Sequence, residues 1–193
     1  MAATTLTLRD AFVGRSSSAR TLAVIVGGAG LIAACAQISI PLGFTPVPIT
    51  GQTFAVLLVG AGLGSVAGTA STLLYVALGA VGLPIYADHS HGWHIVTSAS
   101  GGYLVGFIFA AALTGALAER RWDRRFSSSL GALLTGNVVI YLFGVGWLAH
   151  DAHLSFAKAL ADGLYPFVPG DVLKMYLAAA MLPAAWKLAG RKS

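Results

Sequence analysis

The chain has 193 residues, of which 56% are hydrophobic and only 10% are charged, with a formal net charge of +5. Its mean hydropathy is +0.78. Soluble domains carry about a quarter charged residues, so this composition excludes a soluble globular protein and predicts an integral membrane protein. The length allows roughly six to seven spans of about 20 residues and leaves no room for a sizeable soluble domain.

The N-terminal part predicts a polar leader, one span and a structured loop. Residues 1–21 are polar and basic and predict a flexible cytoplasmic leader. The first span is predicted at 22–39 and holds Cys35, the single cysteine, so no intramolecular disulfide can form. Residues 40–53 contain three prolines within eight positions, which excludes a regular helix and indicates a structured loop.

The apolar stretch 54–83 is too long for one span. Glycines cluster in its first half, so we expect two helices joined by a tight turn near Gly64. The segment 85–96 that follows is polar and predicts a loop. Three more spans are then expected at 97–118, 129–148 and 168–188. The fold prediction is an all-α membrane protein with six transmembrane helices (22–188) in a compact bundle, structured outer loops and a short tail (189–193).

The basic residues flank the apolar runs and so indicate membrane orientation, not a nucleic-acid surface. With six spans, the outer loops hold one of them, Lys158. Apart from Lys174, which lies within the last span, the remainder fall on the other side, which is therefore cytoplasmic, together with both termini. They are Arg9, Arg15, Arg20, Arg120, Arg121, Arg124, Arg125, Lys187, Arg191 and Lys192.

The last span carries two opposite charges, Asp171 and Lys174, inside an apolar run. At helical spacing, positions i and i+3 share a face, so both side chains can point into the bundle. A charge at bilayer depth costs about 2.5–3.5 kcal/mol on insertion scales and usually marks a substrate or ion site. In the alternative interpretation the two residues only neutralise each other, or Lys174 reaches to the interface.

Four segments carry a resemblance to a known family: Pro41-Leu-Gly with Pro46–Thr53, Gly79–Tyr86, Gly101–Phe107 and Pro166–Lys174. Together they resemble the BioY family, the biotin-binding S components of energy-coupling factor (ECF) transporters, from about residue 22 to 188. The resemblance implies a protein of the prokaryotic cytoplasmic membrane that captures biotin from outside. It further implies partners, namely a transmembrane coupling subunit and two ATPase subunits, and neither a cofactor nor enzymatic activity of its own.

A ureido ring offers N–H donors beside a carbonyl acceptor, so a carboxylate and an ammonium one helical turn apart can satisfy both. Asp171 is therefore expected to accept from the ligand and Lys174 to donate to it. Other candidates for the site are Tyr103 as an aromatic wall or a hydroxyl, Gln52 and Thr53 as a lid, Tyr86, and Asn137 as a ligand contact. Alternatively, Tyr103 is an interfacial tyrosine, Gln52 and Thr53 cap a helix, and Asn137 joins two helices.

The tail-binding end is where the chain departs from the family pattern. The family tends to show Gly-Pro-Thr before Gly-Gly-Tyr, whereas this chain has Thr97-Ser-Ala-Ser100. The third-to-fourth loop and span four contain no arginine, so no cationic partner for the biotin carboxylate carries over. Ser98, Ser100 or the loop histidines remain as candidates.

The sequence also allows other functions, namely metal uptake and catalysis, to be considered. His89, His91 and His94 suggest a metal-uptake component for Ni²⁺ or Co²⁺, but no acidic or cysteine ligand motif completes the set, and a solvent-exposed loop is the simpler interpretation. An enzyme with Asp171 as base lacks a second catalytic group. No Walker A motif is present, so ATP hydrolysis would come from partners.

Ala29 and Ala33 of the first span are the candidates for partner docking. They resemble the Ala-x-x-x-Ala stripe by which S components meet the coupling subunit. Alanines at this spacing also pack within a bundle.

Overall fold

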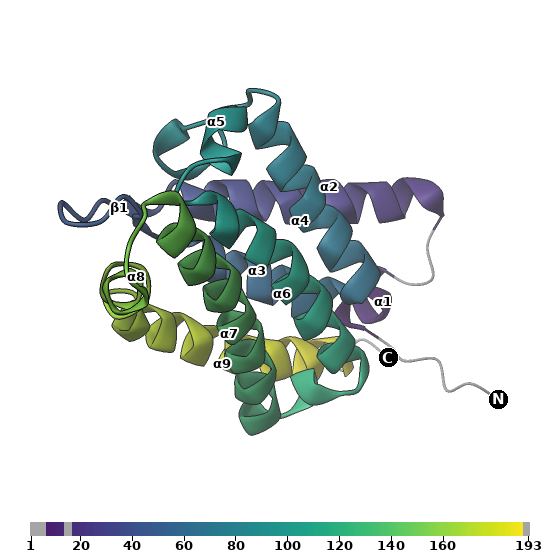
Figure 1. Cartoon of the computed structure of the whole chain (residues 1–193). Helices are drawn as coiled ribbons and strands as arrows, with labels where there is room; N and C mark the ends of the chain where they lie inside the picture. Colours follow the sequence, from purple (N-terminus) through teal and green to yellow (C-terminus); the bar gives the residue numbers. More distant parts are fainter. Residues whose placement is uncertain (1–6, 14–16, 191–193) are drawn as a thin grey trace.

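The structure, a computed structural model, describes residues 7–13 and 17–190 and is almost entirely helical (Figure 1). The elements are α1 (Leu8–Val13), α2 (Ser18–Ala36), β1 (Ser39–Ile40), β2 (Ile49–Thr50), α3 (Gln52–Leu63), α4 (Ser65–Ala80), η1 (Ala87–His89), α5 (Trp93–Val96), α6 (Gly101–Glu119), η2 (Trp122–Arg124), α7 (Phe126–Asp151), α8 (Phe156–Gly163) and α9 (Val168–Gly190). The two strands pair antiparallel, Ser39 with Thr50 and Ile40 with Ile49, and close the base of the proline-rich loop.

Helix α6 occupies the middle of the bundle, where it packs against α3, α4 and α7. Its spanning window is 61% buried, against 22% for α2 and 28% for α9. α6 is apolar all round and rich in Gly and Ala, so neighbouring helices approach it closely. α2 and α9 instead expose large apolar side chains such as Leu22, Val26 and Leu173, as expected for helices that face lipid.

The predicted division of the stretch 54–83 is confirmed. Gly64 separates α3 from α4 with φ +86°, a backbone conformation that favours glycine. The carboxylate of Glu119 then accepts hydrogen bonds from the Ser65 amide (2.7 Å) and hydroxyl (2.8 Å), which caps α4. α3 has 12 residues and α4 has 16, which gives lengths of about 18 and 24 Å at 1.5 Å per residue.

A helix that crosses the hydrocarbon core alone needs about 30 Å. In the described part of the chain, four helices are long and apolar enough for this, namely α2, α6, α7 and α9. α3 and α4 are apolar but shorter. The all-α membrane fold is therefore supported, while six complete crossings stay a prediction.

Two short helices lie where the sequence predicts a flexible leader and a loop. In α1 the Thr7 amide donates to the Asp10 carboxylate (3.2 Å) and the Asp10 amide donates to the Thr7 hydroxyl (3.3 Å), a reciprocal cap. Leu8 is buried, and α1 packs against α3 and α9. α8 is capped by Ser155, whose hydroxyl accepts from the Lys158 amide. Caps of this kind favour even short helices. The predicted leader thus contains a helix at Leu8–Val13, while its cytoplasmic location stays a prediction.

Parts of the predicted leader and tail lie outside the described residues, including Arg15, Arg191 and Lys192. α9 extends to Gly190 and so includes the first residues of the predicted tail. The described basic side chains of the predicted inner side lie on α1, α2, η2 and α9 or beside them. Figure 1 shows α1 and the C-terminal end of α9 on one side of the molecule, with β1 and α8 on the other.

The small residues of α2 that face outward are not those expected. Ala29 is 4% exposed and packs into the bundle together with Gly28, Ile32 and Ala36, because this face of α2 lies against α3 and α4. Ala33 is half-buried. Ala29 is therefore not exposed in this structure, and the role of Ala29 and Ala33 in partner docking stays a prediction. Beyond its first turn, the exposed small residues of α2 are Ala23, Gly27, Gly30 and Ala34.

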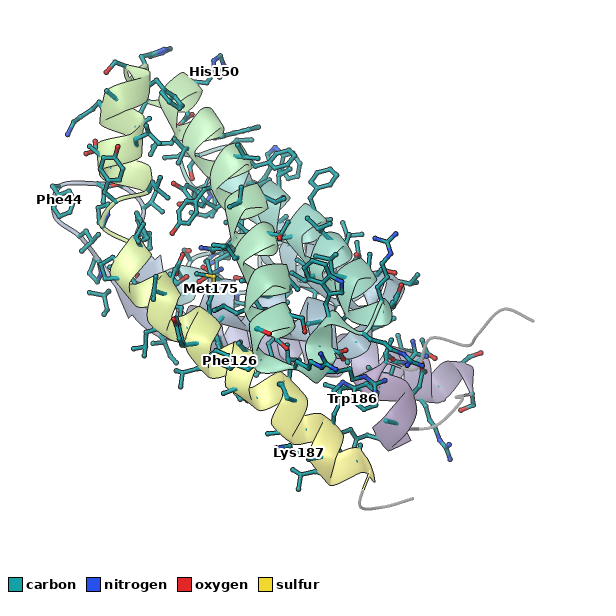
Figure 2. All side chains as sticks on the ribbon, turned by 90° about the horizontal axis from the view of Figure 1, so that it is seen from below. Phe44, Phe126, His150, Met175, Trp186 and Lys187 are labelled. Carbon is teal, nitrogen blue, oxygen red and sulfur yellow. The ribbon has the colours of Figure 1, made fainter. Side chains whose placement is uncertain are left out.

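A polar cluster fastens the α6–α7 turn to α9. The Trp186 indole N–H donates to the buried carboxylate of Asp123 (2.5 Å), and the Arg124 guanidinium lies 3.2 Å from the centroid of the Trp186 ring. Burial raises the pKa of Asp123, while the Trp186 hydrogen bond and the Arg124 charge oppose the rise. This cluster fixes the C-terminal half of α9; Figure 2 labels Trp186 near that end of the helix and Met175 near the other.

Candidate functional site

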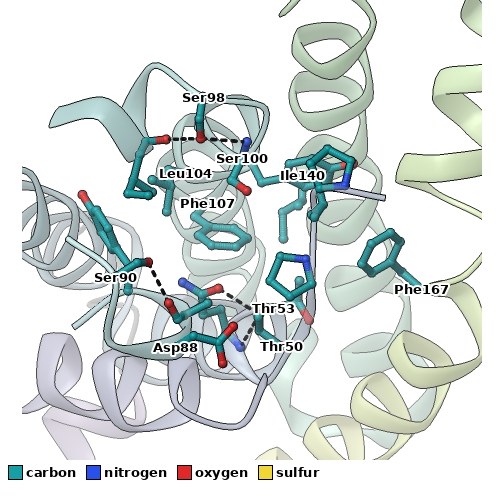
Figure 3. Close-up of a pocket in the computed structure, with 18 of the residues that line it drawn as sticks. Thr50, Thr53, Asp88, Ser90, Ser98, Ser100, Leu104, Phe107, Ile140 and Phe167 are labelled. Atoms are coloured by element: carbon teal, nitrogen blue, oxygen red, sulfur yellow. Dashed lines mark hydrogen bonds between the residues drawn. The ribbon is translucent and has the colours of Figure 1, made fainter. Parts of the chain in front are cut away.

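A cavity of about 290 Å³ lies at the end of the bundle that carries the structured loops (Figure 3). The proline-rich loop and the start of α3 form one wall, residues 86–90 another, and the first turns of α6, the middle of α7 and the start of α9 the rest. Its size is near the lower end of the range for small-molecule sites. Eight predicted site residues line it: Asp171, Lys174, Tyr103, Gln52, Thr53, Ser98, Ser100 and Tyr86.

The two charges of α9 meet in the cavity wall, as their spacing predicts. Lys174 Nζ lies 2.8 Å from Asp171 Oδ1, and Asp171 is only 2% exposed. The Thr53 hydroxyl donates to the same carboxylate oxygen (3.1 Å), and the Tyr141 hydroxyl donates to Oδ2 (2.5 Å). A buried charge is tolerated only when it is paired and hydrogen-bonded in this way.

The hydrogen-bonding capacity of the pair limits what it can offer a ligand. Lys174 has three N–H donors, and it places them on Asp171, on the Thr50 carbonyl (2.7 Å) and on the Thr53 hydroxyl (3.2 Å). The longest contact, to Thr53, is the one that a stronger acceptor replaces most easily. Asp171 has about four acceptor positions and uses three, so it keeps about one for an incoming N–H group.

Two tyrosines stand edge to face beside the pair. The rings of Tyr103 and Tyr141 have centroids 6.3 Å apart and an interplanar angle of 87°. The Tyr103 hydroxyl donates to the Gly163 carbonyl (2.7 Å), so this residue acts as an aromatic wall and ties the end of α8 to the site. Tyr141 was not predicted, although it lies one helical turn from Asn137 and therefore on the same face of α7.

Gln52 and Tyr86 are held by the protein itself. The Gln52 amide donates to the Tyr75 hydroxyl (2.5 Å) and accepts from the Thr50 hydroxyl (2.8 Å). Tyr86 is 1% exposed and donates to the Val76 carbonyl (2.6 Å). Burial raises the pKa of Tyr86 to about 12, which keeps the hydroxyl protonated as a donor. Both residues therefore shape the cavity wall, and a lid formed by Gln52 and Thr53 stays a prediction.

Asn137 lies outside the main cavity. It is 6% exposed and borders a smaller cavity whose walls include Thr53, Asp171 and Lys174. These three residues thus separate the two cavities. Within the described chain, the Asn137 Oδ1 atom accepts no hydrogen bond. The prediction of a direct ligand contact is not supported by this position.

The other lining residues come from segments that sequence reasoning treated only as loop or apolar span. Phe107, Ile140 and Phe167 are labelled in Figure 3 among the apolar walls. Apolar spans give no signal for which residues face a cavity. Asp88 and Ser90 come from the loop 85–96, whose histidines do not line the cavity. Searched over the described residues, no group of three His, Cys, Asp or Glu side chains is arranged to hold a metal ion.

Fold and site together define a helical membrane protein with one loop-covered, largely apolar cavity that ends on a buried ion pair. Comparisons with known proteins narrow this class. Residues 6–191 match the model of the BioY family, so the chain belongs to the BioY family.

Relatives and a solved structure agree with this assignment. The chain is 41% identical over 149 residues to the biotin transporter BioY of Rhizobium etli, which covers 74% of this chain and 79% of the relative. It is 42% identical over 149 residues to that of Thermotoga maritima, with 77% and 85% covered. The crystal structure of an S-component for biotin from an ECF-type ABC transporter superposes with a TM-score of 0.80 at 28% identity, covering 88% of this chain and 92% of that one.

The close packing of Tyr103 against α7 can be tested with two glycines of α7. A Cβ at Gly144 would overlap the Tyr103 ring, whereas one at Gly146 would meet nothing within 4 Å. We expect Gly144→Ala to lower the free energy of unfolding by about 1–3 kcal/mol through overpacking. Gly146→Ala should leave it unchanged or raise it by up to about 1 kcal/mol. Thermal unfolding in detergent measures both; equal effects of the two changes would contradict the described packing.

Proposed function

We propose that this chain is the substrate-binding S component of an ECF-type transporter and that its cavity binds biotin for uptake across the cytoplasmic membrane. The observation that carries the proposal is the Asp171–Lys174 pair, held at the wall of an otherwise mainly apolar cavity within a BioY-family fold. The proposed activity is binding and transport, not catalysis, in keeping with the transporter names of the relatives.

The chemistry of a bicyclic ureido ring fits this pair. One ring N–H donates to the remaining acceptor position of Asp171, and the ring carbonyl accepts from Lys174 in place of the 3.2 Å contact with Thr53. Both new hydrogen bonds are charge-assisted. Phe107, Ile140 and the tyrosine pair supply apolar surface for the rest of the bicycle. Ring recognition thus needs no change of the helices.

For the membrane arrangement we propose six crossings with both termini in the cytoplasm and the cavity facing outward. The excess of Arg and Lys at the end of the bundle opposite the cavity supports this orientation, because cytoplasmic segments carry such an excess. The short helices α3 and α4 are accommodated inside the bundle, where they pack against α6. The membrane is proposed to be the prokaryotic cytoplasmic membrane.

The proposed partners are the ECF transmembrane coupling subunit and two ATPase subunits. The sequence contains no Walker A motif, so the energy of ATP hydrolysis has to come from other chains. On the described surface, the outer face of α2 around Gly27 and Gly30 fits close helix approach better than Ala29 does, because Ala29 is buried.

Transport of a different ligand, another vitamin or Ni²⁺ or Co²⁺, is the alternative. The histidine loop gives the metal version no cluster of ligands among the described residues. The ion pair and apolar walls fit a neutral ring with both donors and acceptors, which keeps biotin as the first proposal.

Asp171→Asn is expected to weaken biotin binding about tenfold to a hundredfold, because the amide loses the charge-assisted acceptor and leaves Lys174 without its counter-charge. Asp162→Asn is the matched control, since Asp162 also pairs with a lysine (Lys158, 2.8 Å) but does not line the cavity. Retention of labelled biotin by the purified proteins measures the effect. Wild-type affinity in Asp171→Asn would show that the pair is only structural.

The orientation is tested by cysteine labelling in intact cells on a Cys35→Ser background. Arg124→Cys should resist a membrane-impermeant thiol reagent, whereas His91→Cys should react, because these positions lie at opposite ends of the bundle in the proposed arrangement. Both residues lie outside the long helices. Reaction at position 124 and protection at position 91 would invert the topology.

A further inference from the structure

The charges around the cavity are distributed unevenly between its inner and outer parts. Of the described residues that line it, one is cationic, Lys174, and two are anionic, Asp171 and Asp88. All three ammonium donors of Lys174 are engaged beside Asp171. A carboxylate on the tail of a ligand therefore meets no lining cation at the outer part of the cavity. It does meet the carboxylate of Asp88.

The rim of the cavity is its outer part, which includes residues 86–90. Asp88 is held at this rim by its loop. It lies in η1, is exposed, and has φ 55°, a left-handed conformation that Asp and Asn adopt more readily than most residues. The Ser39 hydroxyl donates to Asp88 Oδ2 (3.1 Å), which joins the rim loop to the base of the proline-rich loop. The negative charge is thus a fixed feature of the entrance.

Two of the three serines that line the cavity, Ser90 and Ser98, have the wrong polarity for a carboxylate. The Ser90 hydroxyl donates its proton to the Ala87 carbonyl (2.7 Å), and the Ser98 hydroxyl donates to the Ile95 carbonyl (2.9 Å). With their protons committed, both oxygens can only accept a further hydrogen bond. A carboxylate has only acceptors, whereas a carboxamide has N–H donors. These two hydroxyls therefore complement the N–H donors of an amide, whereas the hydroxyl of Ser100, the third lining serine, can donate to a tail of either kind.

We propose that the site selects for the ring and against a charged tail, so that carboxamides of biotin, with a neutral tail, bind at least as tightly as biotin itself. This rests on the proposed function, in which the ring occupies the Asp171–Lys174 end; we place the tail toward residues 86–90, the part of the cavity wall that carries Asp88. The ligand class is then wider than the free vitamin and includes amide-linked conjugates. Asp88 is the residue that disfavours the free carboxylate.

The test uses the purified full chain and competition of labelled biotin by unlabelled biotin and by biotinamide. Biotinamide is expected to compete within about threefold of biotin, or better. Asp88→Asn should tighten biotin binding by about two- to fivefold at low ionic strength, the effect of one exposed charge, and leave biotinamide unchanged. Added salt should reduce the gain. Asn keeps the left-handed backbone and an oxygen for Ser39, so the loop is preserved.

Asp151→Asn is the control, because Asp151 is also exposed but does not line the cavity; it should change neither affinity. Biotinamide binding tenfold or more weaker than biotin would overturn the proposal, as would an equal change of both affinities in Asp88→Asn. If the proposed function is wrong, neither biotin nor biotinamide binds the wild-type chain, which distinguishes that case from the two results above. Absence of binding by both ligands would overturn this proposal as well.

Discussion

The structure depends on one constraint: a carboxylate and an ammonium group have to be kept at the inner end of an apolar cavity. Asp171 and Lys174 satisfy it through each other, Thr53, Tyr141 and the Thr50 carbonyl. Three separate parts of the chain, the start of α3, the middle of α7 and the start of α9, therefore converge on the pair. Removing any one of them would leave a buried charge incompletely compensated, which is costly.

The remainder of the bundle holds these three parts in place. α6 fills the centre with small residues, and Tyr103 at its start links the site to the end of α8. At the far end the Asp123–Trp186 hydrogen bond fixes α9 against the α6–α7 turn. Polar groups at both ends of α9 thus anchor a helix whose outer face is apolar. The cavity lies at the end of the bundle where the proline-rich loop and residues 86–90 form part of its wall.

Much of this arrangement could be predicted from the sequence, for physical reasons that differ between elements. Asp171 and Lys174 stand out because charges are rare in apolar runs, and their spacing fixes a shared face. The Gly64 turn follows from length and glycine content. Helix α1 could not be predicted, because the reciprocal cap that stabilises it leaves little trace in the sequence. The burial of Ala29 could not be predicted either, because α2 is apolar on nearly all sides and its sequence does not show which face points inward. Tyr141 and Asp88 enter the site through tertiary packing alone.

The central claim is that the ion pair recognises the bicyclic ureido ring. A crystal structure of the chain with bound biotin tests it most directly. We expect a ring N–H of biotin within hydrogen-bond distance, about 2.7–3.2 Å, of the Asp171 carboxylate, with the ring carbonyl beside Lys174 and the tail directed toward residues 86–90. Biotin bound outside this cavity, or with its carboxylate on Lys174 and its ring at the rim, would show that the ion pair does not recognise the ring.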